Sequence, residues 1–137
     1  MLSDQKEVLV TLRSTFSEPH FGQFIFLLST SDIFISATKL FLHILSQYTG
    51  YNNGDFCITW SFMRKRNWRS KGTISKAKKE LLDKGVIELS RRGGRNRAHL
   101  YALTLYSVDE CNGKLDIKST KYPKNIWRKN EPKKPLK

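Results

Sequence analysis

The stretch SKGTISKAKKELLDKGVIELSRRGGRNRAHLYALT, residues 70–104, changes its apolar pattern at Gly85. Before Gly85, apolar side chains recur every three or four residues, which predicts a helix with one buried face. That face consists of Ile74, Ala77, Leu81 and Leu82. After Gly85, apolar and polar side chains alternate, which predicts strands. A helix followed by two strands is therefore the unit from which the fold can be built outward.

Both ends of this predicted helix have residues that suit them. Ser70 is a good N-cap, because its hydroxyl can accept a hydrogen bond from a backbone N–H of the first turn. Gly85 can adopt the left-handed conformation that ends a helix. The face opposite the apolar one carries hydroxyls and amines, which reach phosphates and base edges. Its residues are Lys71, Thr73, Ser75, Lys76, Lys78 and Lys79.

The two predicted strands, residues 86–92 and 97–104, form a hairpin. We expect Gly93 and Gly94 to make its tip, because glycine reaches positive φ without steric cost. Four arginines surround this tip, and a hairpin does not need them. They are Arg91, Arg92, Arg95 and Arg97. So many cations at one turn indicate a partner that carries negative charge.

Two further helices are expected before Ser70. The first spans residues 37–48, where apolar side chains recur on one face, and the second, shorter one lies within residues 58–66. Helix, short helix, turn, basic helix and hairpin then follow one another in the order of a winged helix-turn-helix domain. We therefore expect an α+β fold of that kind, mainly α with a small β-hairpin.

In that fold each basic segment has a place on double-stranded DNA. The recognition helix, residues 70–84, enters the major groove, and the wing, residues 90–98, lies on the flanking backbone or in the minor groove. The residues expected to contact DNA are Arg64, Lys65, Arg66, Arg69, Ser70, Lys71, Thr73, Ser75, Lys76, Lys79, Arg91, Arg92, Arg95, Asn96 and Arg97.

Four short motifs occur in order between residues 50 and 110. They are NNGD at 52–55, WRSK at 68–71, KGVIE at 84–88 and GGRNR at 93–97. Together they resemble a family of small winged helix-turn-helix proteins of bacterial chromosomes, phages and plasmids. The resemblance implies a winged-helix DNA-binding fold and does not define a biological process.

Charge is distributed unevenly along the 137 residues, whose formal net charge is +13. Residues 64–97 contain thirteen Lys and Arg against three Asp and Glu, and residues 114–137 contain nine against two. This excess favours nucleic acid or an anionic membrane face as the partner. Because no segment has the ~20 apolar residues of a membrane span, we expect no membrane partner and a cytoplasmic, nucleoid-associated protein.

The length suits one domain with additional terminal segments. Residues 1–20 form an N-terminal extension whose pattern fits either a helix or a strand. Residues 21–112 are expected to form the winged domain, and residues 113–137 a basic C-terminal tail, largely extended or disordered. The aromatic stretch from Phe21 to Phe26 could supply a homodimer interface or complete the core of a monomer, and the sequence leaves both open.

Trp60 and Trp68 lie within the expected helix pair and are assigned to the core. The cysteines, Cys57 and Cys111, lie far apart without a CxxC pair, so we expect both to be reduced.

The sequence contains no pattern typical of a catalytic or metal-binding site. The histidines, His20, His43 and His99, are isolated, so we expect neither a metal site nor a cofactor. The chain lacks a GxxxxGK loop, an HExxH helix and a nucleophile elbow, so we expect no enzyme.

Three functions fit this sequence. The first is a sequence-selective double-stranded DNA-binding protein that regulates transcription, and it explains the recognition helix and the wing together. The second is an accessory protein of plasmid or phage replication or partition, which would use the same surface on repeated sites. The third is a mobile-element protein that binds and modulates a host nucleoprotein complex through a protein partner. We expect the first.

Overall fold

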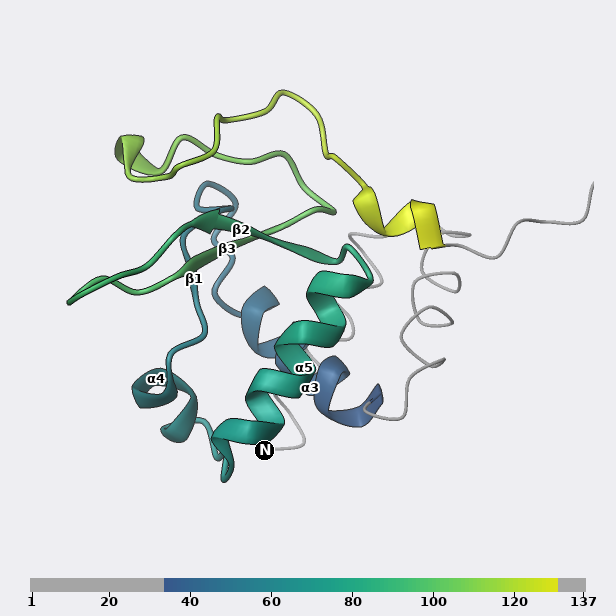
Figure 1. Ribbon diagram of the computed structural model, residues 1–137. Helices are drawn as coiled ribbons and strands as arrows, with labels where there is room; N and C mark the ends of the chain where they lie inside the picture. The colour runs from purple at the N-terminus through teal and green to yellow at the C-terminus, as the bar shows by residue number, and fades with distance from the viewer. Residues whose placement is uncertain (1–33, 131–137) are drawn as a thin grey trace, which may run out of the picture.

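The computed structural model describes residues 34–130 (Figure 1). Three interpretations lie outside these residues: the helix or strand at residues 1–20, the aromatic stretch at 21–26, and the end of the basic tail at 131–137.

The chain forms three α-helices and a small antiparallel sheet within the described range. The helices are α3 (Phe34–Leu45), α4 (Trp60–Arg64) and α5 (Lys71–Asp83). The strands are β1 (Phe56–Cys57), β2 (Ile87–Arg91) and β3 (Leu100–Leu103), in the order β1-β3-β2. Two short 3₁₀ turns follow, η1 (Cys111–Gly113) and η2 (Ile126–Asn130). The expected combination of helices with a β-hairpin is confirmed at the level of an α+β fold.

Helix α5 has the two ends that its sequence predicts. The Ser70 hydroxyl accepts a hydrogen bond from the Thr73 backbone N–H at 3.3 Å, so it caps the helix. Gly85 has a φ of 72° and ends the helix in the left-handed region. Ile74, Ala77 and Leu81 are buried, and in Figure 1 this helix crosses α3. The predicted apolar face is therefore confirmed, with its fourth residue, Leu82, partly buried against the core.

The first helix ends earlier than expected, at Leu45 rather than near Tyr48. After Leu45 the backbone makes tight turns in which Gln47 and Tyr48 donate to carbonyls three residues back. The Asn52 side chain donates to the Gln47 carbonyl at 2.7 Å and accepts from the Thr49 N–H at 2.8 Å. These side-chain hydrogen bonds replace another helical turn.

Strand β1 was not expected, and it turns the predicted two-stranded hairpin into a three-stranded sheet. Its two residues pair with β3 in the register Phe56 with Tyr101 and Cys57 with Leu100. The helix that was expected to begin near Ile58 begins at Trp60. A strand of two residues is too short to produce a periodic pattern, so sequence reasoning had no signal for it.

The NNGD motif fixes the loop before β1. The Asn53 side chain is fully buried, donates to the carbonyls of Leu103 and Ser107 at 2.9 Å and accepts from the Leu103 N–H at 2.8 Å. Asp109 in turn accepts a hydrogen bond from the Asn53 backbone N–H at 2.8 Å. Because buried polar groups must be hydrogen-bonded, this one amide ties the loop to the end of β3.

The expectation that Gly93 and Gly94 form the hairpin tip is wrong. Gly94 and Arg97 pair across a two-residue turn, which places Arg95 and Asn96 at the tip. Asn96 supplies the positive φ, at 58°, and neither glycine has one. Asparagine tolerates the left-handed region better than most residues, so it can take the place expected for glycine.

Residues 113–130, part of the expected basic C-terminal tail, lie against the domain. In Figure 1 they run along the sheet and end in η2 near the C-terminal end of α5. Trp127 is only 1% exposed and belongs to the same core cluster as α3 and α5. Asn125 donates to the Thr104 carbonyl at 2.8 Å. This basic segment therefore contributes Trp127 to the core of the domain.

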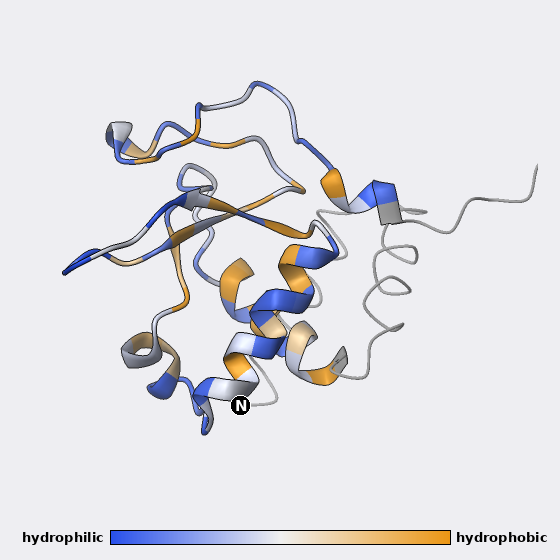
Figure 2. Ribbon diagram, viewed as in Figure 1, coloured by the Kyte–Doolittle hydropathy of each residue, from blue (hydrophilic) through white to orange (hydrophobic). Residues whose placement is uncertain are grey.

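Figure 2 shows apolar residues gathered where the helices and the sheet face one another. Trp68 lies in this core with an exposed fraction of 5%, as its position in the helix pair predicted. Trp60 is only partly buried and packs against the edge of the cluster.

Candidate nucleic-acid interface

The end of α4 at Arg64 and the residues between α4 and α5 form a basic turn in which Trp68 is buried. Arg64, Lys65 and Arg69 are exposed. Arg66 is held in place, because its guanidinium donates to the Ser46 hydroxyl at 2.8 Å and lies over the Phe62 ring at 4.4 Å. Of the four predicted contact residues in this turn, Arg66 is thus the one with a structural role of its own.

On α5 the expected contact residues are exposed and lie away from the core. They are Ser70, Lys71, Thr73, Ser75, Lys76 and Lys79. Lys79 differs from the others, because its ammonium forms an ion pair with Asp83 at 2.7 Å. The hydrogen bond from Asp83 and its negative charge raise the pKa of Lys79. The charge of Lys79 is therefore partly compensated within the protein.

The hairpin exposes Arg92, Arg95, Asn96 and Arg97. Arg91 is half-buried and donates across the hairpin to the Ala98 carbonyl at 3.1 Å, so it supports the turn. Arg97 forms an ion pair with Asp116 at 3.4 Å. In the described part of the chain, Arg92 and Arg95 form no ion pair, which leaves their charge uncompensated.

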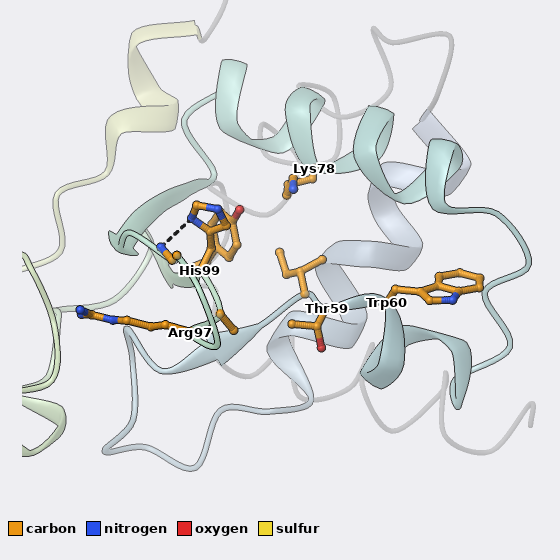
Figure 3. Close-up of a pocket in the computed structure, with 10 residues that line it drawn as sticks. Thr59, Trp60, Lys78, Arg97 and His99 are labelled. Atoms are coloured by element: carbon orange, nitrogen blue, oxygen red, sulfur yellow. Dashed lines mark hydrogen bonds between the residues drawn. The ribbon is translucent and has the colours of Figure 1, made fainter.

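A groove of about 390 Å³ lies where the hairpin approaches α4 and α5, and we call it the hairpin groove. Its lining residues are Ile58, Thr59, Trp60, Lys78, Gly93, Gly94, Arg97, Ala98, His99 and Tyr101. Figure 3 shows Lys78 on one side, Thr59 and Trp60 on another, and His99 on the hairpin side, where its ring accepts a hydrogen bond from the Gly93 N–H at 2.9 Å. The same view shows Arg97 extending away from Lys78. The groove therefore brings together three elements that are separate in sequence.

Sequence reasoning placed Lys78 on the polar face but left it out of the contact set. The structure places it at the groove, with its ammonium 5.9 Å from the centre of the Tyr101 ring. The signal was the spacing of Lys71, Ser75 and Lys78, which puts all three on one side of a helix. Lys71 lies 5.8 Å from the ring of Trp60, another groove residue, in agreement with that spacing.

Some cations of the described residues form ion pairs and others do not. Lys79, Lys84, Lys114 and Lys124 form ion pairs with Asp83, Glu80, Asp55 and Glu88 respectively. Within the described range, Arg64, Lys65, Arg69, Lys71, Lys76 and Lys78 form none. Figure 2 shows hydrophilic residues along α5 and at the hairpin tip. Cations without an ion pair are thus clustered on α5, the turn before it and the hairpin tip, and within the described range Lys118 and Lys121 of the C-terminal segment also form none.

Other kinds of site have little support within residues 34–130. No group of three or more His, Cys, Asp and Glu there could hold a metal ion. Cys57 and Cys111 are not joined by a disulfide. His43 is half-buried, and burial, followed by the charges of Arg66 and Lys39, lowers its pKa to about 4. No helix of this range is long and apolar enough to cross a membrane.

No protein-family model, curated protein or solved structure matches this chain.

Proposed function

We propose that this chain is a winged helix-turn-helix protein that binds double-stranded DNA in a sequence-selective manner and regulates transcription. The observation that carries the proposal is the clustering, among the described residues, of cations without an ion pair on α5, on the turn before it and at the hairpin tip; Lys79 on α5 and Arg97 on the hairpin are paired exceptions.

The order of elements supports the winged-helix assignment. Helix α3 is followed by the short strand β1, the helix pair α4 and α5, and the hairpin of β2 and β3. In Figure 1 the hairpin and α4 lie on the same side of α5, so one DNA segment could meet all three.

Helix α5 has the dimensions that a major groove accepts. Its 13 residues span about 20 Å, and an α-helix with side chains is about 10–12 Å wide against a groove about 12 Å wide. Thr73, Ser75 and Lys76 are exposed on it and offer the hydroxyl and amine groups that contact base edges. The arginines of the turn and the hairpin would contact flanking phosphates, which position the helix without reading sequence.

A selection from a random-sequence duplex library, run near physiological salt with competitor DNA, tests this proposal. We expect one enriched motif, and alanine at Thr73 or Lys76 should relax its preference at particular base pairs by about 1–3 kcal/mol. Equal binding to all sequences would contradict sequence-selective recognition. A chain that binds no duplex and retains a protein from a nucleoprotein complex would instead favour the mobile-element function.

A further inference from the structure

The hairpin groove contains Lys78, which forms no ion pair within the described residues, whereas its second cation, Arg97, is paired with Asp116, which does not line the groove. Among its ten lining residues are Lys78 and Arg97, and none of the ten is Asp or Glu. Lys78 lies over the Tyr101 ring, and Lys71 at the groove's edge lies over the Trp60 ring. A cation over an aromatic face keeps much of its charge available, because the ring quadrupole attracts it without neutralising it. The groove is therefore suited to an anion.

Among the described residues, neither backbone conformation nor packing requires glycine at Gly94, which lies on the hairpin side of the groove. Its φ is not positive, and a Cβ built on it would meet no atom within 4 Å. Gly93 differs, because a Cβ there would lie 2.6 Å from the Arg97 carbonyl oxygen. Glycine without a conformational or packing requirement is consistent with close approach of a ligand to the backbone. Gly94 thus points to a ligand that comes near the hairpin itself.

We propose that one sugar–phosphate strand of nucleic acid lies in the hairpin groove, with a phosphate between Lys78 and the main chain at Gly94. This inference rests on the proposed function and extends it, because it adds Lys78, Thr59 and Gly94 to the contact surface. Lys78 lines the groove from α5, and Thr59, the residue before α4, lines it from another side.

A strand explains the groove better than a free nucleotide does. Tyr101 is 5% exposed and Lys78 lies over its ring, so the face needed to stack a base is covered. The cationic surface also continues past the groove to Lys71 and to the hairpin tip at Arg95. A polymer with successive phosphates can use all of this charge, whereas a mononucleotide can use only part of it.

The test is a fluorescence anisotropy titration of a labelled duplex over a range of salt concentrations. It compares the wild type with Lys78→Gln, Lys78→Arg and Gly94→Ala. Lys118→Gln is the matched control, because Lys118 is exposed and does not line the groove. Thermal unfolding of each variant shows whether the fold is kept. Unlabelled mononucleotide and inorganic phosphate are added as competitors in separate arms.

We expect Lys78→Gln to weaken duplex binding by about tenfold and to reduce the magnitude of the log–log salt slope by about 0.9. Lys78→Arg should retain most of the affinity, Gly94→Ala should lower it, and Lys118→Gln should change it least. Millimolar mononucleotide or phosphate should not displace the duplex.

Two results would overturn the inference in different ways. If the wild type binds duplex DNA and Lys78→Gln and Gly94→Ala bind it equally well, the strand does not lie in the groove, and the proposed function stands. Displacement by mononucleotide at concentrations that leave the ionic strength unchanged would assign the groove to a nucleotide. If the wild type binds no duplex, both the groove assignment and the proposed function fail.

Discussion

The carboxylate of Asp116 lies 3.4 Å from the guanidinium of Arg97, so the C-terminal segment touches the hairpin through an ion pair. Asp116 also accepts a hydrogen bond from the Arg92 backbone N–H at 2.7 Å, and its own N–H donates to the Ser90 carbonyl at 2.8 Å. One acidic residue therefore both orients the hairpin and reduces the charge that Arg97 can offer to a phosphate.

Replacement of Asp116 by Asn should strengthen duplex binding by roughly two- to fivefold, the range of an exposed ion pair. The amide oxygen can still accept from the Arg92 N–H, while the charge that competes with phosphate for Arg97 is lost. Asp55→Asn is the control, because Asp55 pairs with Lys114 and not with the hairpin. Weaker binding by Asp116→Asn in the same titration would contradict this account of Arg97.

Gly72 offers a way to separate stability from binding. It lies in the first turn of α5 without a positive φ, and a Cβ there would meet only the Ser70 hydroxyl, at 3.6 Å. Gly72→Ala should therefore raise the free energy of unfolding by about 0.5–1 kcal/mol, because alanine loses less entropy in a helix.

The same variant should bind duplex DNA more weakly if α5 enters the major groove with its first turn close to the backbone. Urea unfolding and duplex titration of one preparation give both numbers. A variant that is more stable and binds as well as the wild type would contradict close approach at this turn.

Trp127→Ala should lower the free energy of unfolding by about 3–5 kcal/mol, because a buried aromatic side chain leaves a large cavity. Tyr122→Ala, in the same segment, should change it little, since Tyr122 is 70% exposed. Chemical denaturation of both variants checks this. Equal stability of the two would mean that residues 113–130 do not complete the core.

The pH dependence of stability should include a contribution from His43. Its pKa in the folded protein is about 4, below the ordinary value of 6.5, so the unfolded chain binds more protons between these two pH values. The free energy of unfolding should therefore decrease as the pH falls from about 6.5 to 4, and be independent of this histidine above 6.5.

Denaturant unfolding at pH 7 and pH 5 measures this effect, and His43→Gln should show a smaller decrease than the wild type. The side chain is about half-buried, so solvent screening reduces the size of the effect. An identical decrease in the variant would assign the pH dependence to other groups.

Local signals in the sequence were sufficient to predict features that depend on a single helix. The cap at Ser70, the apolar face of Ile74, Ala77 and Leu81, and the termination at Gly85 are all set within α5 and were all predicted. The boundaries of α3 depended instead on Asn52, whose hydrogen bonds to the turn are visible only in three dimensions.

The position of the hairpin tip depends on the pairing between strands, which could not be predicted from the sequence. The register of β2 on β3 and the irregularity between Leu89 and Arg91 determine where the hairpin turns, and this moved the tip from Gly93 and Gly94 to the next two residues. Similarly, the burial of Trp127 could not be predicted from composition, because the segment around it is rich in lysine.

The basic residues of the candidate interface could be predicted from their clustering, but their partners could not. The ion pair between Lys79 and Asp83 could have been predicted, because the two residues are four positions apart on a helix. Asp116 reaches Arg97 only because residues 113–130 fold back, and Lys78 lines the groove only because the fold places its ammonium over the Tyr101 ring of β3.

The measurement that tests the central claim most directly is the salt dependence of duplex binding for the double variant Arg92→Gln/Arg95→Gln. Its control is Lys118→Gln/Lys121→Gln, which removes the same charge from the C-terminal segment. If the hairpin contacts the DNA backbone, the hairpin variant should bind all duplex sequences more weakly, and the magnitude of its salt slope should be smaller by about 1.8 than that of the wild type. The control should keep a slope closer to the wild-type value. Equal slopes for the two double variants would show that the hairpin makes no contact of its own and would contradict the proposed mode of DNA binding.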